Sequence, residues 1–146
     1  MTIRNFRFFT MLSLFLVASL TTKAQILMDS TLLKTAITTK DCIETPKKFI
    51  GKDVVLKCTI IGSSEITMDK TQLVYVLEAD ERFPDNRVSI LITETDADKM
   101  NFSRYKYHNR KAIIKGKLVK NKKFKDGFGN PRYTISVSDL DQITLY

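Results

Sequence analysis

The residues of this 146-residue chain that are best suited to chemistry are cations gathered toward its C-terminus. Phe128 lies among them between two glycines, where a short loop cannot easily bury its ring. Lysine and arginine neutralise phosphates and an exposed ring stacks on a base, so this set predicts binding of nucleic acid or another anionic polymer. A lysine-rich hairpin that only keeps the domain soluble has the same composition. The candidate ligand-binding residues are Lys115, Lys117, Lys120, Lys122, Lys123, Lys125, Phe128 and Arg132.

The charges of the chain are separated along its length. Residues 101–125 hold ten lysines and arginines and no acid, whereas residues 78–98 hold seven acids and two arginines. Clustered charge of one sign creates a local potential that attracts a partner of the opposite sign. The basic segment favours an anionic polymer. The alternative is a structural or protein-interaction module in which the acidic segment or the N-terminal helices meet an envelope protein. A third possibility is oligosaccharide binding, for which we expect more exposed aromatic rings than Phe128 alone.

No group of residues predicts catalysis or a metal site. Glu94, Asp96 and Asp98 lack the glycine and the distal glutamate of a calcium loop, and a place at the start of a helix explains them. His108 has no serine or cysteine nucleophile beside it in a known motif. Two cysteines and one histidine offer no recognisable zinc-ligand spacing. We therefore expect a non-enzymatic protein without metal or cofactor.

Three tyrosines are weaker candidates for a binding face. Tyr75, Tyr105 and Tyr107 could line such a face, because exposed aromatic rings stack on ligands. Tyr75 has the same strand parity as Leu73 and Leu77, which favours a core or edge position for it.

Cys42 and Cys58 are the two cysteines of the chain. A bridge between them would close a loop of about 15 residues and would contribute about 3 kcal/mol in the chain-entropy model. Two separate buried thiols fit the sequence equally well, because sequence separation does not bring two Cα atoms within disulfide range. Both alternatives stay open, and we expect the bridge if the N-terminal helices pack on the first strand.

The first 24 residues predict a secretory signal peptide. Arg4 and Arg7 precede an apolar run from Phe8 to Leu20, and small residues flank a cleavage point after Ala24. The apolar run is about 13 residues long, too short for a spanning helix. We expect a periplasmic or secreted protein, with no membrane insertion after cleavage. Removing 24 of 146 residues leaves 122, which suits one domain.

The elements that must position these residues are mostly strands. Residues 25–48 predict a helical extension in short pieces, capped by Asp29 or Ser30. A second turn starts at Thr38 or Thr39 and falters at Pro46. Period-two alternation or apolar runs then predict strands at 53–61, 72–78, 87–93, 111–119 and 132–137. Gly62 to Ser64 should end the first strand, and residues 121–130 should form a polar loop.

Residues 93–105 predict a short helix capped by Thr93 or Thr95. In the fourth strand Gly116 indicates a bulge or bend, and in the fifth we expect Arg132, Thr134 and Ser136 to point outward. Ile143 and Leu145 extend the sheet.

Three strands, a short helix and two strands are the element order of an OB-fold barrel. The segment Phe49 to Leu56 resembles the opening strand of small stand-alone bacterial OB-fold domains, and Arg110 to Leu118 resembles their fourth strand. Cys58 departs from a glycine often found in that first strand. The resemblance covers residues 49–146 and implies binding rather than catalysis. We thus expect a mainly β protein: a signal peptide at 1–24, an N-terminal helical extension at 25–48, and a five-stranded OB-fold-like barrel at 49–146.

Overall fold

The computed structural model describes residues 32–68, 71–85 and 87–146. Residues 32–35 are helical, and the compact unit that holds every element discussed below spans Ala36–Tyr146. The predicted signal peptide, and the part of the predicted helical extension before residue 32, lie outside the described residues.

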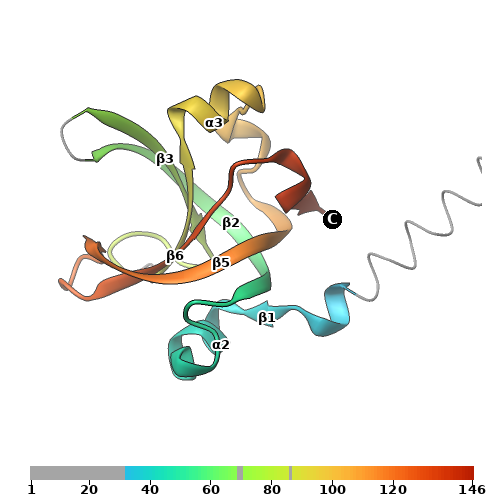
Figure 1. The fold of residues 1–146 in the computed structure, drawn as a ribbon, viewed down its shortest axis with the longest axis vertical. Helices are drawn as coiled ribbons and strands as arrows, with labels where there is room; N and C mark the ends of the chain where they lie inside the picture. Colours follow the sequence, from blue (N-terminus) through green and yellow to red (C-terminus); the bar gives the residue numbers. More distant parts are fainter. Residues whose placement is uncertain (1–31, 69–70, 86) are drawn as a thin grey trace, which may run out of the picture. The chain divides into compact units, whose positions relative to one another are not determined.

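The protein is mainly β (Figure 1). Short helices separate the strands, and three of them are single turns of 3₁₀ helix, labelled η. The elements in chain order are β1 (Ile37–Thr38), α2 (Thr39–Glu44), η1 (Pro46–Lys48), β2 (Asp53–Met68), β3 (Gln72–Ala79), β4 (Val88–Thr93), α3 (Glu94–Lys99), η2 (Arg104–Lys106), β5 (Arg110–Lys125), β6 (Pro131–Ser136), η3 (Leu140–Gln142) and β7 (Ile143–Leu145).

One seven-stranded sheet contains all of these strands, in the order β1-β2-β3-β4-β6-β5-β7. An additional pairing between β2 and β5 links the sheet back on itself, so five strands partly close into a ring. β4 and β6 pair in parallel, whereas the other neighbours in this ring are antiparallel. The predicted C-terminal extension of the sheet is confirmed, because β7 pairs with β5.

β2 is twice as long as its alternation predicts. Its first half, up to Ile60, pairs with β5, and its second half pairs with β3. The register shifts between Ile60 and Gly62, which is where the strand changes partner. The prediction that Gly62 to Ser64 end the strand is therefore wrong, since these residues continue it past an irregularity.

β5 changes partner in the same way. It pairs with β2 through Lys117 and with β6 from Leu118 onward. Gly116 comes just before this change, and a Cβ there would lie 2.6 Å from Cγ2 of Ile135. The predicted bend at Gly116 thus coincides with a close approach of two strands. The predicted loop at 121–130 is shorter than expected, because β5 runs on to Lys125.

The segment before β2 belongs to the same unit as the sheet. β1 pairs in parallel with β2, and α2 follows with Thr38 as its N-cap, so the helix begins where a second turn was predicted. The Thr38 hydroxyl accepts a hydrogen bond from Asp41 N, and the Asp41 carboxylate accepts one from Thr38 N at 2.7 Å. This reciprocal pair lowers the pKa of Asp41.

α3 links β4 to β5 and is shorter than predicted. Thr93 caps it by accepting a hydrogen bond from Asp96 N at 3.2 Å, so the first of the two predicted caps is confirmed. The helix ends at Lys99 because Asn101 has a left-handed φ of 48°. A separate 3₁₀ turn, η2, then leads into β5.

The main core lies inside the ring and is almost entirely aliphatic. Cys42 of α2 and Tyr107 join it from outside the strands. Its largest fully buried side chains are Leu56, Ile60, Leu77, Ile90, Ile92, Ile114, Leu118 and Ile135. A second, smaller cluster of Val74, Val76 and Leu91 lies apart from it, with Ile66, Met68 and Phe124 packed against it.

Candidate functional site

The outer half of the β5–β6 hairpin carries the predicted cations, and we call residues 117–132 the basic hairpin. It projects on the same side of the molecule as the β2–β3 hairpin (Figure 1). Lys115 is half-buried. Exposed lysines along the basic hairpin are Lys117, Lys120, Lys122, Lys123 and Lys125.

Most of these lysines are uncompensated by nearby acids. Lys117, Lys120, Lys122 and Lys125 form no ion pair with any residue that the structure describes. Since neighbouring like charges repel, the hairpin carries a concentrated positive potential that is free to act on an external anion. The structure thus brings together five of the eight predicted site residues as exposed cations.

The turn of the basic hairpin is held in shape by Asp126. Its Oδ1 accepts hydrogen bonds from Asn130 N at 2.7 Å and Phe128 N at 3.0 Å, and its Oδ2 accepts one from Asn130 Nδ2 at 3.0 Å. The side chain is only 1% exposed, and Arg87 Nε lies 3.7 Å from Oδ2. Burial alone would raise the pKa of Asp126, but the hydrogen bonds from Asn130 and Phe128 and the charge of Arg87 lower it overall.

Phe128 is presented outward by this turn, with 69% of the residue exposed. The turn also rests on the loop between β3 and β4. Gly127 N donates to Pro84 O at 3.0 Å, and a Cβ at Gly127 would collide with the Pro84 ring. The backbone that carries the predicted exposed ring is therefore held in place by the β3–β4 loop.

Arg132 is not part of the exposed surface of the basic hairpin. It was predicted to point outward, yet it is only 4% exposed. Its Nη1 donates to Ser89 Oγ at 3.4 Å, and its guanidinium lies 4.5 Å from the Phe124 ring centre and 5.6 Å from that of Phe83. Burial lowers the pKa of Arg132. Of the other two residues predicted to point outward, Thr134 is buried and Ser136 is exposed. Phe124 and Phe83 cover Arg132 from other segments, which strand alternation alone does not reveal.

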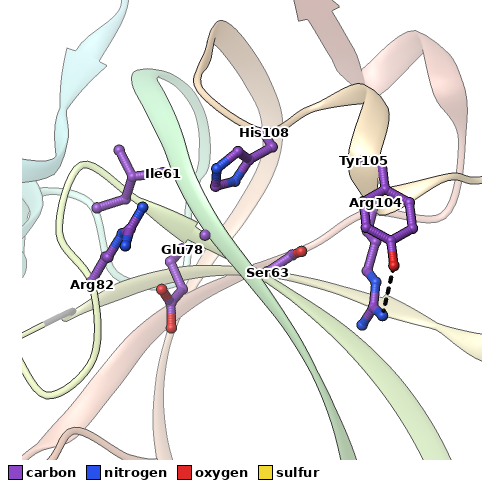
Figure 2. Close-up of a pocket in the computed structure, with 8 residues that line it drawn as sticks. Ile61, Ser63, Glu78, Arg82, Arg104, Tyr105 and His108 are labelled. Carbon is purple, nitrogen blue, oxygen red and sulfur yellow. Dashed lines mark hydrogen bonds between the residues drawn. The ribbon is translucent and has the colours of Figure 1, made fainter.

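A pocket of about 480 Å³ opens across β2, away from the basic hairpin (Figure 2). Figure 2 shows Glu78 and Arg82 on one side of Ser63, with Arg104 and Tyr105 on the other. The lining residues are Ile61, Gly62, Ser63, Glu78, Arg82, Arg104, Tyr105 and His108. Sequence reasoning missed this site because its members come from three separate segments. The one local signal is Gly62, which faces Glu78 across the β2–β3 pair.

A smaller pocket of about 250 Å³ lies over the second apolar cluster. Val74 and Leu91 belong to both, while Met68 and Asn121 line the pocket from β2 and β5. The remaining lining residues are Gln72, Thr93, Asp96, Ser136, Val137 and Ser138.

The other predicted candidates lie outside the basic hairpin. Tyr75 packs on the core and lies 5.6 Å from Phe102 between ring centres, so the core interpretation is confirmed. Tyr107 is buried, and Tyr105 is exposed. Glu94 and Asp96 occupy the first turn of α3. Among the described residues, no group of three or more His, Cys, Asp or Glu side chains is arranged to hold a metal ion.

Cys42 and Cys58 are free thiols, and the predicted disulfide is not formed in the structure. Both are buried in the main core, where cysteine packs as a small apolar side chain. Burial raises the pKa of Cys42 to about 11 and that of Cys58 to about 12. The second alternative, two buried thiols, is the one that the structure has.

Neither a protein family nor a curated protein matches this chain. Within the described ranges, no helix has the length and apolarity needed to cross a membrane. Function must therefore be argued from the geometry of the surface.

Proposed function

We propose that this protein is an exported, non-catalytic OB-fold module that binds an anionic extended polymer, nucleic acid among them, through its basic hairpin. The ring order β2-β3-β4-β6-β5, with α3 between its third and fourth strands in the chain, supports the OB-fold assignment. Loops between the first and second, and the fourth and fifth, strands flank the ligand in that fold. Here these loops are the tips of the β2–β3 and β5–β6 hairpins.

One observation carries the proposal: four exposed lysines without an ion-pair partner in the described chain lie on the same hairpin as an exposed aromatic ring whose backbone is held by Asp126. The core needs neither feature. A solvated hairpin needs charge but gains nothing from a rigid turn that holds Phe128 in water. Lysines that track a backbone and a ring that stacks on bases together suit a single-stranded polyanion.

The test is a fluorescence-anisotropy titration with a labelled single-stranded oligothymidine at low salt. We expect binding at protein concentrations up to about 100 μM, weakening steeply as salt rises because each phosphate contact releases counterions. Replacing Lys120, Lys122, Lys123 and Lys125 by Glu should abolish binding. Phe128→Ala should cost about 1–3 kcal/mol of binding free energy if a base stacks there.

A matched control separates local from global charge. Changing Lys40, Lys47, Lys48 and Lys111 to Glu, all exposed and all outside residues 117–132, alters the net charge equally and should leave most of the affinity intact. If both fourfold variants lose binding equally, net charge and not the hairpin attracts the polymer. If the wild-type protein binds no oligonucleotide, the polymer proposal fails.

The second candidate is a protein-interaction module of the cell envelope. Phe83 and Phe128 are 61% and 69% exposed, on loops joined through the Gly127–Pro84 hydrogen bond. Two exposed aromatic rings on neighbouring rigid loops are typical anchors of a protein interface. Pull-down from the native envelope fraction with wild-type protein and a Phe83→Ala/Phe128→Ala variant distinguishes this candidate, because only a protein partner would be retained in nuclease-treated extract.

A further inference from the structure

The pocket across β2 contains side chains that can donate hydrogen bonds and side chains that can accept them. The side chains of Arg82 and His108 make no hydrogen bond or ion pair with any described residue, and both are exposed. They come from different loops, and Figure 2 shows His108 between Arg82 and Tyr105. An arginine fork and an imidazole can both donate to an anionic group. The pocket therefore offers an anion site that the protein itself does not fill.

Glu78 adds an acceptor to the same pocket. A Cβ at position 62 would meet Oε2 of Glu78, the end of a flexible side chain, so the glycine leaves room for the carboxylate where it now lies over β2. Ser63, the next residue of β2, adds a hydroxyl that can donate or accept. A carboxylate in the pocket repels a ligand that is only an anion. The fitting ligand must also carry hydroxyl or amino donors.

Tyr105 supplies an apolar wall. It is 78% exposed, yet it is not loose. Arg104 Nη2 donates to its hydroxyl at 3.3 Å, and the guanidinium lies 5.2 Å from the ring centre. Arg104 is itself held by Glu65 through a 2.9 Å ion pair. A positioned, solvent-exposed ring offers a flat face on which the C–H face of a sugar can pack.

We propose that this pocket binds an anionic sugar, a hydroxylated ring that bears one carboxylate or phosphate group. Arg82 and His108 hold the anionic group, Glu78 and Ser63 take the hydroxyls, and Tyr105 packs against the ring. The volume of about 480 Å³ lies in the range of small-molecule sites and has room for a monosaccharide. The site is separate from the basic hairpin, and the inference stands without the polymer proposal.

The test is an NMR titration of the ¹⁵N-labelled protein with D-glucuronate, glucose 6-phosphate, D-glucose and inorganic phosphate. We expect saturable shifts of the amides of Ser63, Arg82, Tyr105 and His108 with one or both anionic sugars. Which of the two binds more tightly identifies a carboxylate or a phosphate as the anionic group. Glucose and inorganic phosphate, which each present half of the chemistry, should bind far more weakly.

Variants then assign the contacts. Arg82→Ala and Tyr105→Ala change exposed side chains, so the fold should survive, and each should weaken binding about tenfold, as expected for a lost charge-assisted contact or ring contact. Lys47→Ala, at an exposed lysine outside both proposed sites, is the matched control and should bind the anionic sugar as the wild type does. The fourfold Glu variant of the basic hairpin should also keep its sugar affinity, which separates this proposal from the polymer proposal.

Three results would overturn the proposal. Equal binding of glucose and glucuronate would show that the pocket does not recognise the negative charge. Inorganic phosphate binding as tightly as glucose 6-phosphate would show that the pocket does not recognise the sugar ring. No saturable shift with either anionic sugar would remove the site altogether.

Discussion

At the scale of single residues, one buried carboxylate determines how the exposed aromatic ring is presented. Asp126 accepts hydrogen bonds from Phe128 N and Asn130 N and lies beside Arg87. An ionised carboxylate accepts such bonds more strongly than a neutral carboxyl or amide does. The charge of Asp126, as well as its shape, should therefore matter to the turn.

We predict that Asp126→Asn lowers the thermal stability at neutral pH, and that the difference from wild type disappears in acid. The pKa of Asp126 is lowered on folding, so its contribution to stability is complete above the unfolded value of about 3.9. That contribution is lost as the pH falls through the lower, folded pKa. Thermal melts of both proteins between pH 7 and pH 2 check this. Melting curves that stay equally far apart at every pH would contradict it.

At the scale of elements, two long strands create the closed part of the sheet by changing partner midway. β2 does so at the Ile60/Gly62 irregularity, and β5 does so just after Gly116. Without this change of partner, β2 and β5 would each have to be replaced by two strands joined by a turn. The second half of β5 forms one strand of the basic hairpin, so the direction of the hairpin depends on this change of partner.

Gly116→Val should destabilise the protein by about 1–3 kcal/mol, the usual cost of overpacking a tight contact. The new Cβ would lie 2.6 Å from Cγ2 of Ile135 and 3.3 Å from Ser136 O, and a strand backbone cannot shift freely. Urea unfolding measures the change. Lys117→Val places the same side chain at the next, exposed position and should change stability little. Equal effects of the two substitutions would mean that β-strand propensity, not crowding, is responsible.

At the scale of the whole molecule, packing of the N-terminal segment on the ring decides the state of the cysteines. Cys42 comes from α2 and Cys58 from β2, yet both lie in one core. We predict that neither thiol reacts readily with a thiol reagent at pH 8 in the native protein, because burial raises both pKa values and blocks access. Denaturation without reductant should expose two reactive thiols. Finding none would restore the disulfide.

The same burial sets the behaviour at alkaline pH. Folded-state pKa values of about 11 and about 12 lie above that of an unfolded cysteine, about 8.5, so the unfolded chain releases these protons first. Stability is therefore complete below about pH 8.5 and should fall as the pH rises above it. A Cys42→Ala/Cys58→Ala variant should lose this part of the pH dependence.

Local patterns by themselves determined most of the strands and caps of this protein. Alternation of Val54, Leu56 and Cys58 identified the inward face of β2, and Thr38 and Thr93 cap the helices that their neighbours predicted. These features depend on residues a few positions apart, which the sequence displays directly. The exposed lysines and Phe128 also follow from local composition, because a polar turn between strands lies at the surface.

Only the tertiary structure decided where strands change partner and which polar residues are buried. Gly62 and Ser63 predict the end of a strand, yet β2 continues through them by pairing with β3. The new neighbouring strand supplies the backbone hydrogen bonds, which the local sequence does not reveal. Arg132 alternates outward but is covered by Phe83 and Phe124 from other segments. The pocket of Ser63, Arg82 and Tyr105 likewise exists only because ring closure brings distant segments together, and no spacing along the chain encodes that distance.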